Sequence, residues 1–301
     1  MSAYLRIPDL VRDTQLQATF YPNPSMPTTT THTYPQNTAH GIEIWTRMKR
    51  LDNGGNGIVW LEALNKRSYV SYGLRAVKEL RIQNRNGNQD YKRELEALAT
   101  FSQEKFVYFF VEFYGWFKSS DTLFIAMEYH EHGDLRNYIA KHGRLRETEA
   151  RDITWQNILI LSKPPKDKWR IKICDLGLSR KIEGDVRSIT ARGTPGFMPP
   201  ELVPGIGRNI RNADPFPADV WCLGETVFKM LTCQATFDNT LGIYRYWKGE
   251  LRFPWRPLEE ARVSKTGIEF IQLLMTASPS QRLNAKQATQ HHLGSAQRFH
   301  V

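Results

Sequence analysis

The pattern of apolar residues changes part-way along the chain, and this change limits the folds that the chain can adopt. From about Ile44 to Glu128, short β-branched and aromatic runs alternate with Gly and Asn, which is typical of strands joined by turns. After Gly133 the apolar residues recur at helical spacing, as in "ADVWCLGETVFKMLT". A strand-rich part followed by a helix-rich part predicts an α+β fold with two lobes.

One segment of the strand-rich part has helical spacing instead. In "YKRELEALATF" the apolar residues Leu95, Leu98 and Ala99 fall on one face, which predicts a helix. The following stretches "VYFFVEFYGWF" and "LFIAMEY" are rich in aromatic residues and predict two further strands.

The beginning of the chain has a different amino-acid composition. Residues 14–42 carry no Asp, Glu, Lys or Arg and contain a run of threonines and several prolines. Because such a segment cannot form an amphipathic element, we expect a flexible extension over residues 1–43. The folded domain would then cover residues 44–295, with lobes at 44–128 and 129–295. Residues 296–301 would form a C-terminal tail.

Composition restricts the class of protein. With 41% hydrophobic and 24% charged residues, the 301-residue chain resembles an ordinary globular protein. No apolar run reaches the roughly 20 residues that span a bilayer, and the opening "MSAYLRIPDLVRD" has no secretory pattern. Three cysteines without metal-ligand spacing favour an intracellular protein, in the cytoplasm or the nucleus. We expect no membrane partner.

The net charge of +10 raises the question of an acidic partner. Residues 1–42 contribute nothing, because two arginines balance two aspartates there, so the excess lies in the remainder. The cations are dispersed and no run reaches five. This pattern favours a solvated basic face over a nucleic-acid surface. The same positive potential would also attract a phosphate-bearing ligand.

A glycine-rich turn, "LDNGGNGIV", lies between two predicted strands. Gly54 and Gly57, followed by Val59, would let backbone amides approach a phosphate closely, because no Cβ stands in the way. A glycine-rich hairpin without a ligand is an equally good interpretation of this turn alone. It is not a P-loop, because no GK[ST] follows.

Two further motifs carry charged groups. Lys78 lies inside the apolar strand "RAVKEL", and Glu94 follows 16 residues later on the predicted helix. A strand lysine is usually a surface residue, but an ion pair with Glu94 would hold its ammonium toward a phosphate. In "IKICDLGLSR", Asp175 follows a β-rich run and precedes a glycine, a natural position for a Mg²⁺ ligand.

Taken in order, these motifs resemble a known family. "LDNGGNGIV", "AVK", Glu94, "MEYHEHGDL", Asn157 before "ILI", "DLG", "GTPGFMPPE", "ADVWCLG" and "PSQRLNAKQA" are similar to the successive signatures of eukaryotic protein kinases. The resemblance spans about residues 44–293, and "GTPGFMPPE" is similar to the serine/threonine type. It implies a bilobal fold, with a β-rich N-lobe and a mainly helical C-lobe.

The resemblance also implies roles for individual residues. Those on the nucleotide side would contact ATP or support that contact: Gly54, Gly57, Val59, Ala76, Lys78, Glu94, Met127 and Glu128. Asn157 and Asp175 would hold Mg²⁺ between the phosphates. Lys78, Asn157 and Asp152 would form the catalytic set, with Asp152 as the base that accepts the substrate hydroxyl proton. Glu201 and Arg282 would form a structural ion pair.

The chain departs from the family pattern in the glycine-rich turn and after Asp175. Asp52 occupies the position of the first loop glycine, Asn56 replaces an aromatic residue at the tip, and Leu176 replaces the phenylalanine of "DFG". The Leu176 change is mild. A carboxylate at Asp52 would repel a triphosphate unless it points away.

Two alignments compete for "RETEARDITWQNILIL". In the first, "ARDITWQN" replaces the catalytic loop "HRDLKPxN", which keeps Asp152 and Asn157 in step but loses the loop histidine and lysine to Ala150 and Thr154. In the second, which we favour, the segment from Leu145 begins the long helix that precedes the loop in kinases. Its acidic first turn suits a helix N-terminus.

Under either alignment the chain is short between "GDL" and Asn157. Kinases accommodate a long helix and the catalytic loop there, so on the order of twenty residues, or ~30 Å of helix, are missing. We therefore expect a C-lobe that lacks most of this helix. A deletion in the gene and an exon omitted from the predicted sequence would both produce this junction.

The sequence leaves three functions open to test. The first is a serine/threonine protein kinase that transfers the γ-phosphoryl group of Mg-ATP to a protein hydroxyl. The second is a pseudokinase or truncated kinase that binds nucleotide or protein partners without transfer. The third, a nucleic-acid binder, would show steeply salt-dependent binding to generic RNA or DNA.

Overall fold

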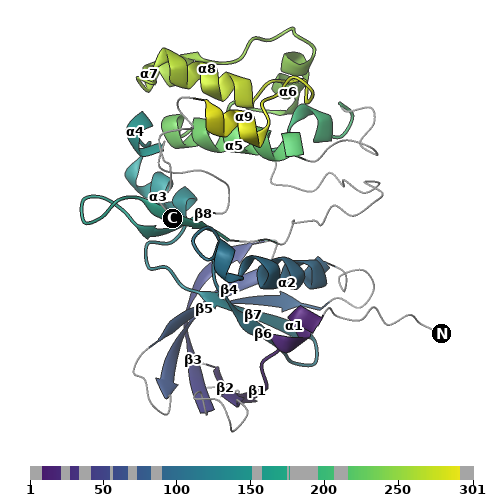
Figure 1. The fold of residues 1–301 in the computed structure, drawn as a ribbon, viewed down its shortest axis with the longest axis vertical. Helices are drawn as coiled ribbons and strands as arrows, with labels where there is room; N and C mark the ends of the chain where they lie inside the picture. Colours follow the sequence, from purple (N-terminus) through teal and green to yellow (C-terminus); the bar gives the residue numbers. More distant parts are fainter. Residues whose placement is uncertain are drawn as a thin grey trace, which may run out of the picture. The chain divides into compact units, whose positions relative to one another are not determined.

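The computed structural model describes residues 9–21, 28–33, 42–54, 57–66, 73–82, 90–150, 158–174, 176, 196–206 and 216–291. The chain forms two compact units (Figure 1). Unit 1 is Met1–Glu131 with Cys174–Arg180, and unit 2 is His132–Ile173 with Lys181–Val301. A strand-rich first unit and a helix-rich second unit confirm the predicted α+β class.

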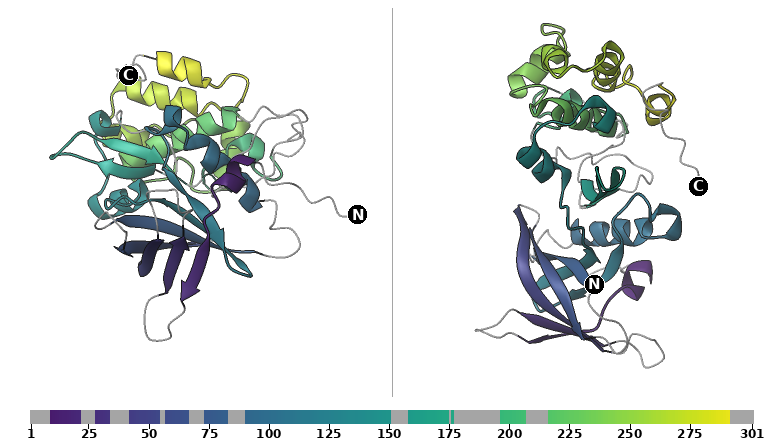
Figure 2. Two further views of the ribbon diagram at one scale, coloured as in Figure 1. Left: turned by 60° about the horizontal axis from the view of Figure 1, so that its bottom comes forward. Right: turned by 90° about the vertical axis from the view of Figure 1, so that its left-hand side faces the viewer.

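Unit 1 is built on a seven-stranded sheet in the order β1-β2-β3-β4-β5-β7-β6, and every neighbouring pair is antiparallel. The strands are β1 (Ala18–Tyr21), β2 (Thr29–Thr33), β3 (Ile42–Gly54), β4 (Gly57–Lys66), β5 (Leu74–Arg81), β6 (Phe113–Lys118) and β7 (Thr122–Glu128). The strands of the sheet are strongly twisted (Figure 2), as expected for strands of L-residues.

Unit 1 also has the helices α1 (Asp9–Asp13) and α2 (Asp90–Phe101) and the 3₁₀ turn η1 (Glu104–Phe106). The helix predicted from "YKRELEALATF" is confirmed as α2, and Leu95, Leu98 and Ala99 are all buried. The strand expected from "VYFFVEFYGWF" begins only at Phe113, because residues 107–109 form turns after η1.

The flexible extension expected over residues 1–43 is wrong for its described segments. β1 and β2 lie within it, and β2 pairs with the edge of β3 from Thr29↔Thr46 to Thr33↔Ile42. Threonine is β-branched and favours strands, and in β2 the buried residues Thr30 and His32 alternate with more exposed threonines. This uncharged segment forms a strand because every second side chain is buried. The side chains on its more exposed face need not be charged.

Unit 2 is mainly helical. Its helices are α3 (Leu135–His142), α4 (Glu147–Ala150), α5 (Phe216–Thr232), α6 (Thr240–Trp247), α7 (Arg256–Glu260), α8 (Lys265–Leu274) and α9 (Ala285–Gln290), with the 3₁₀ turn η2 (Pro200–Leu202). A two-stranded sheet pairs β8 (Ile158–Ser162) with β9 (Arg170–Ile173). Buried residues of α5, including Trp221 and Phe228, belong to the main hydrophobic cluster of the unit. Within the described ranges no helix is both long and apolar enough to cross a membrane.

The predicted structural ion pair forms inside unit 2. Arg282 donates to both carboxylate oxygens of Glu201, at 2.8 and 3.0 Å, in the bidentate geometry that guanidinium groups favour. It also donates to the carbonyl oxygens of Pro217 and Thr276 and packs over the ring of Trp221. This cation is fully buried, with 0% of its side chain exposed.

The segment of the two competing alignments begins as a helix. Residues 147–150 form α4, with Ala150 buried, and β8 starts at Ile158. Only residues 151–157 remain between them, and these lie outside the described ranges. The start of a helix at Glu147 agrees with the second alignment, and the distance in sequence to β8 leaves no room for a helix of about twenty further residues.

Candidate functional site

The glycine-rich turn closes the hairpin of β3 and β4. Gly54 pairs with Gly57 at the end of the ladder. Gly57 has φ +113°, and a Cβ there would lie 2.4 Å from the carbonyl oxygen of Glu79 on β5. Only glycine fits this position, and the reason visible in the structure is close packing on the next strand. Asp52 is exposed, and its carboxylate accepts a hydrogen bond from the Asn53 amide.

Four of the residues that the family resemblance assigns to the nucleotide lie on one face of the sheet. Lys78 is the register partner of Val59 on β4, and Ala76, two residues away on the same strand, is the partner of Met127 on β7. Register partners, and residues two apart on a strand, project to the same side of a sheet. The sheet therefore brings Val59, Ala76, Lys78 and Met127 together.

Lys78 and Glu94 form the ion pair that the sequence predicts. Their Nζ and Oε1 atoms are 2.6 Å apart, and each side chain is 7% exposed. β5 supplies the lysine, and α2 supplies the glutamate next to its buried apolar residues. An ammonium held by a carboxylate in a dry environment is fixed in direction, and this bond uses one of the three donors that a lysine carries.

Glu128 differs from these four residues. It pairs with Arg75, so its side chain projects to the opposite face, where it accepts a hydrogen bond from the Glu112 amide. Its own amide donates to the carbonyl oxygen of Glu112. Glu128 therefore cannot offer its amide to a ligand while this strand end is intact.

The predicted base and metal ligands, Asp152, Asn157 and Asp175, lie outside the described residues. Their roles stay predictions. Leu176, which follows Asp175, is described and buried, as expected for a residue in the place of a phenylalanine.

The comparison with known families agrees with this geometry. The model of the protein kinase domain matches residues 45–158 and 151–293. This chain belongs to the protein kinase family. The two matched segments cover most of the chain, and they include both the Lys78–Glu94 pair and the Glu201–Arg282 pair.

Several curated proteins are similar to this kinase-family chain. The serine/threonine-protein kinase cds1 of Schizosaccharomyces pombe is 26% identical over 81% of this chain and 57% of that protein. The serine/threonine-protein kinases ATG1a of Arabidopsis thaliana and RAD53 of Saccharomyces cerevisiae are 25% and 27% identical over 80% and 72% of this chain. The chain spans 57% of the length of cds1, 40% of ATG1a and 29% of RAD53.

The two matches to the kinase family overlap at residues 151–158. The first match continues beyond α4, and the second begins before β8. These are the residues for which two alignments compete. The same short segment is therefore matched twice, as the end of the first match and as the start of the second.

The opposite face of the sheet in this kinase-family chain holds a buried polar network that no sequence motif predicted. Arg75, three residues before Lys78, donates to Glu62 Oε2 from Nε at 3.0 Å and from a terminal nitrogen at 2.7 Å. The same nitrogen lies 2.9 Å from Nε2 of His32, and the guanidinium packs over Trp45. The signal was present as opposite charges at Glu62 and Arg75, which are register partners on neighbouring strands.

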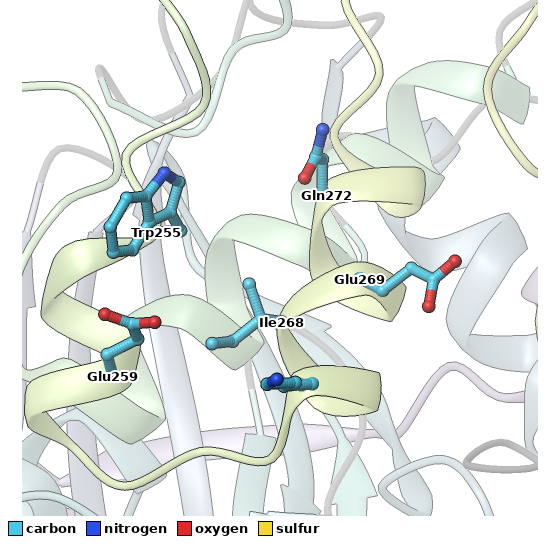
Figure 3. A pocket seen from close by; sticks show the side chains of 6 residues that line it. Trp255, Glu259, Ile268, Glu269 and Gln272 are labelled. Carbon is cyan, nitrogen blue, oxygen red and sulfur yellow. The ribbon is translucent and has the colours of Figure 1, made fainter.

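Unit 2 of the kinase-family chain has a shallow hollow of about 320 Å³ between α7 and α8 (Figure 3). Its lining residues are Trp255, Glu259, Lys265, Ile268, Glu269 and Gln272. None of the residues predicted to contact nucleotide or metal lines it. The hollow therefore shares no residue with the candidate site of unit 1.

Proposed function

We propose that this chain binds ATP through unit 1 and acts as a serine/threonine protein kinase. The observation that carries the proposal is the buried Lys78–Glu94 pair, 2.6 Å long, on the same sheet face as Val59, Ala76 and Met127. An oriented ammonium supports contact with the α and β phosphates, and the small side chain of Ala76 leaves space beside it. Serine/threonine specificity is supported by the names of the similar kinases.

In this proposal Asn157 and Asp175 hold Mg²⁺, because an amide oxygen and a carboxylate are the hard donors that this ion prefers. The bound ion would supply neutralisation of phosphate charge. Asp152 would accept the proton of a protein hydroxyl, and Lys78 would orient the phosphates. The proposal includes a protein substrate and places this chain inside the cell, which its three free cysteines, Cys174, Cys222 and Cys233, support.

A second candidate is a pseudokinase that binds nucleotide or a protein partner without phosphoryl transfer. The overlapping matches at residues 151–158 and the one-turn helix α4 favour it. Both support the proposal that the segment carrying Asp152 is shortened. Loss of the residues that position a base costs activity even when binding is intact, because transfer depends on alignment of the reacting atoms.

The first experiment measures nucleotide binding on the full chain. We expect ATP with Mg²⁺ to raise the melting temperature, and we expect Lys78→Met to abolish that rise. Because Lys78→Met removes the cation beside the buried carboxylate of Glu94, it should also destabilise the protein by about 3 kcal/mol. The double variant Lys78→Met/Glu94→Leu controls for this loss. Binding that survives in the double variant would contradict the assignment of Lys78.

The second experiment separates the two candidate functions. The assay measures the transfer of radioactive phosphate from labelled ATP to a mixture of peptides that contain Ser or Thr. It is carried out on the wild-type chain and on Asp152→Ala. Transfer that disappears in Asp152→Ala supports the kinase. Binding without transfer in the wild-type chain supports the pseudokinase and overturns the role of Asp152.

A further inference from the structure

The N-terminal segment of the chain runs along β6, the strand at the opposite end of the strand order from β1. Leu16 donates its amide to the carbonyl oxygen of Trp116 at 2.8 Å, and the Trp116 amide donates to Thr14 at 3.1 Å. This parallel bridge adds residues 14–16 to the outer edge of β6. Because β1 continues from the same segment and pairs with β2, residues 9–21 connect the two edges of the sheet. We call residues 9–21 the N-terminal clamp.

The clamp covers both faces of the sheet. On one face Leu16, Ala18 and Phe20 pack against the cluster of Val77, Phe117, Phe124 and Ala126. On the other face α1 packs against α2, and α2 packs against β6 (Figures 1 and 2). The anchor of α1 is a hydrogen bond of 2.7 Å from the indole nitrogen of Trp116 to the Val11 carbonyl oxygen.

Trp116 and Lys78 lie in one cross-strand row. Lys78 on β5 pairs with Ile125 on β7, and Ile125 pairs with Trp116 on β6. Their side chains therefore share a face, and all three are buried. Glu94 of α2 reaches Lys78 on this face. Lys78, Ile125, Trp116, α1 and α2 thus form a closed ring of contacts.

The position of α1 within this ring is tightly constrained. Val11 is 1% exposed, and Trp116 is 3% exposed. Gly115, next to Trp116, has φ +122°, and a Cβ there would lie 2.6 Å from the carbonyl oxygen of Thr14. The backbone of the clamp therefore approaches β6 as closely as a glycine permits.

We propose that the N-terminal clamp positions α2, so that Glu94 reaches Lys78, and that Val11 and Trp116 are positioning residues for this pair. α2 is held by packing on its buried side, and an ion pair between two elements forms only when both are in place. The consequence for nucleotide rests on the proposed function, because it requires that Lys78 binds phosphate.

The test of the clamp itself needs no nucleotide. Hydrogen exchange of the α2 amides is measured on the full chain for the wild type, Val11→Ala and the control Phe20→Leu. Phe20 belongs to the same segment but packs on the opposite face. We expect Val11→Ala to lower the protection of α2 about tenfold relative to that of β4 and β5. We expect Phe20→Leu to leave this ratio unchanged.

A second measurement connects the clamp to the ion pair. The affinity for a fluorescent ATP analogue is compared for Val11→Ala, Glu94→Gln and the double variant. We expect Val11→Ala to weaken binding severalfold in the wild-type background and to have no further effect beside Glu94→Gln.

Three results would overturn the proposal. The first is unchanged protection of α2 in Val11→Ala, and the second is an equal loss of α2 protection, relative to β4 and β5, in Phe20→Leu. The third is that Val11→Ala weakens binding of the ATP analogue as much beside Glu94→Gln as it does in the wild-type background. If the wild-type chain binds no nucleotide at all, the proposed function fails, and the exchange measurement still decides whether the clamp holds α2. A loss of α2 protection in Trp116→Phe, which removes the indole donor together with part of the buried ring, would further support the anchor.

Discussion

Arg75 and Lys78 are two buried cations on one strand, and they serve opposite faces of the sheet. Lys78 pairs with the carboxylate of Glu94 on the face of the candidate site. Arg75 fills the other face, where its planar guanidinium binds Glu62 with two nitrogens and packs over Trp45. A lysine has a single nitrogen and no planar group, so it could not both bind Glu62 with two nitrogens and pack flat over Trp45. Arg75 therefore fits its surroundings by shape as well as by charge.

The histidine in this network makes stability depend on pH. Burial, and secondarily the charge of Arg75, lowers the pKa of His32 to about 4. The unfolded chain, with a pKa near 6.5, binds the proton first as the pH falls. The free energy of unfolding should therefore decrease between about pH 6.5 and pH 4, by ~3 kcal/mol, and level off below that range.

Urea unfolding of the wild-type chain and of His32→Gln at pH 7 and pH 4.5 measures this contribution. The variant should lose less free energy of unfolding between the two pH values than the wild type. His142→Gln, which changes an exposed histidine of α3, is the control and should retain the wild-type pH dependence. Equal pH dependence in the wild type and His32→Gln would contradict the prediction.

At the scale of elements, α4 is fixed by a contact far along the chain. The carboxylate of Glu147 accepts hydrogen bonds from the amide and the hydroxyl of Ser264, both at 2.8 Å. Ser264 is the N-cap of α8, and its hydroxyl accepts from the Gly267 amide. Glu147 therefore connects the start of α4 to the start of α8.

We expect Glu147→Ala to destabilise unit 2 by about 1 kcal/mol, because it removes two charge-assisted hydrogen bonds at a partly exposed site. Glu149→Ala is a matched control two residues away. It removes the ion pair with the exposed Arg146 guanidinium and the hydrogen bond from the Arg146 amide at 2.9 Å, and it should cost about 0.5 kcal/mol. Chemical unfolding of both variants gives the comparison, and equal losses would show that Glu147 has no special role.

The elements differ in how well sequence predicts them. α2 could be predicted because Leu95, Leu98 and Ala99 repeat at the helical period and are buried for that reason. β2 was missed because polar threonines supply its alternation and its buried side chains include a histidine. Residues 107–109 form turns although their β-branched and aromatic side chains also suit a strand, because they continue directly from the 3₁₀ turn η1.

On the scale of the whole molecule, each unit has its own hydrophobic cluster. Val77, Phe117 and Phe124 belong to unit 1, whereas Trp221 and Phe228 belong to unit 2. We therefore expect a core substitution to reduce stability within its own unit.

Arg282→Met tests this expectation. It removes the bidentate pair with Glu201 and leaves that carboxylate without its guanidinium, so the free energy of unfolding of unit 2 should fall by about 3 kcal/mol. Hydrogen exchange should accelerate in α5 and α8 and stay unchanged in β5 and β7. The control, Arg245→Met, affects an exposed 4.0 Å pair with Glu250 and should have little effect. Acceleration in both units would indicate a single cooperative molecule.

The family and its two lobes could be predicted from sequence because its motifs occur in a fixed order, and the Lys78–Glu94 pair could be predicted from their place within it. The Trp116–Val11 contact could not. It joins residues 105 positions apart through the backbone carbonyl of Val11, a group that every residue type has, so the sequence at Val11 does not indicate the contact. Such contacts depend on the closed path of the chain, not on a local pattern.

That separation also sets an order of events during synthesis. The clamp leaves the ribosome before its partner on β6, which emerges 105 residues later, about 5–20 s at ordinary translation rates. β2 and β3 can pair early, because they are close in sequence, whereas α1 has no docking surface until Trp116 has emerged. Residues 9–16 of the clamp are therefore among the last parts of unit 1 to dock, and they remain exposed to other chains until β6 is complete.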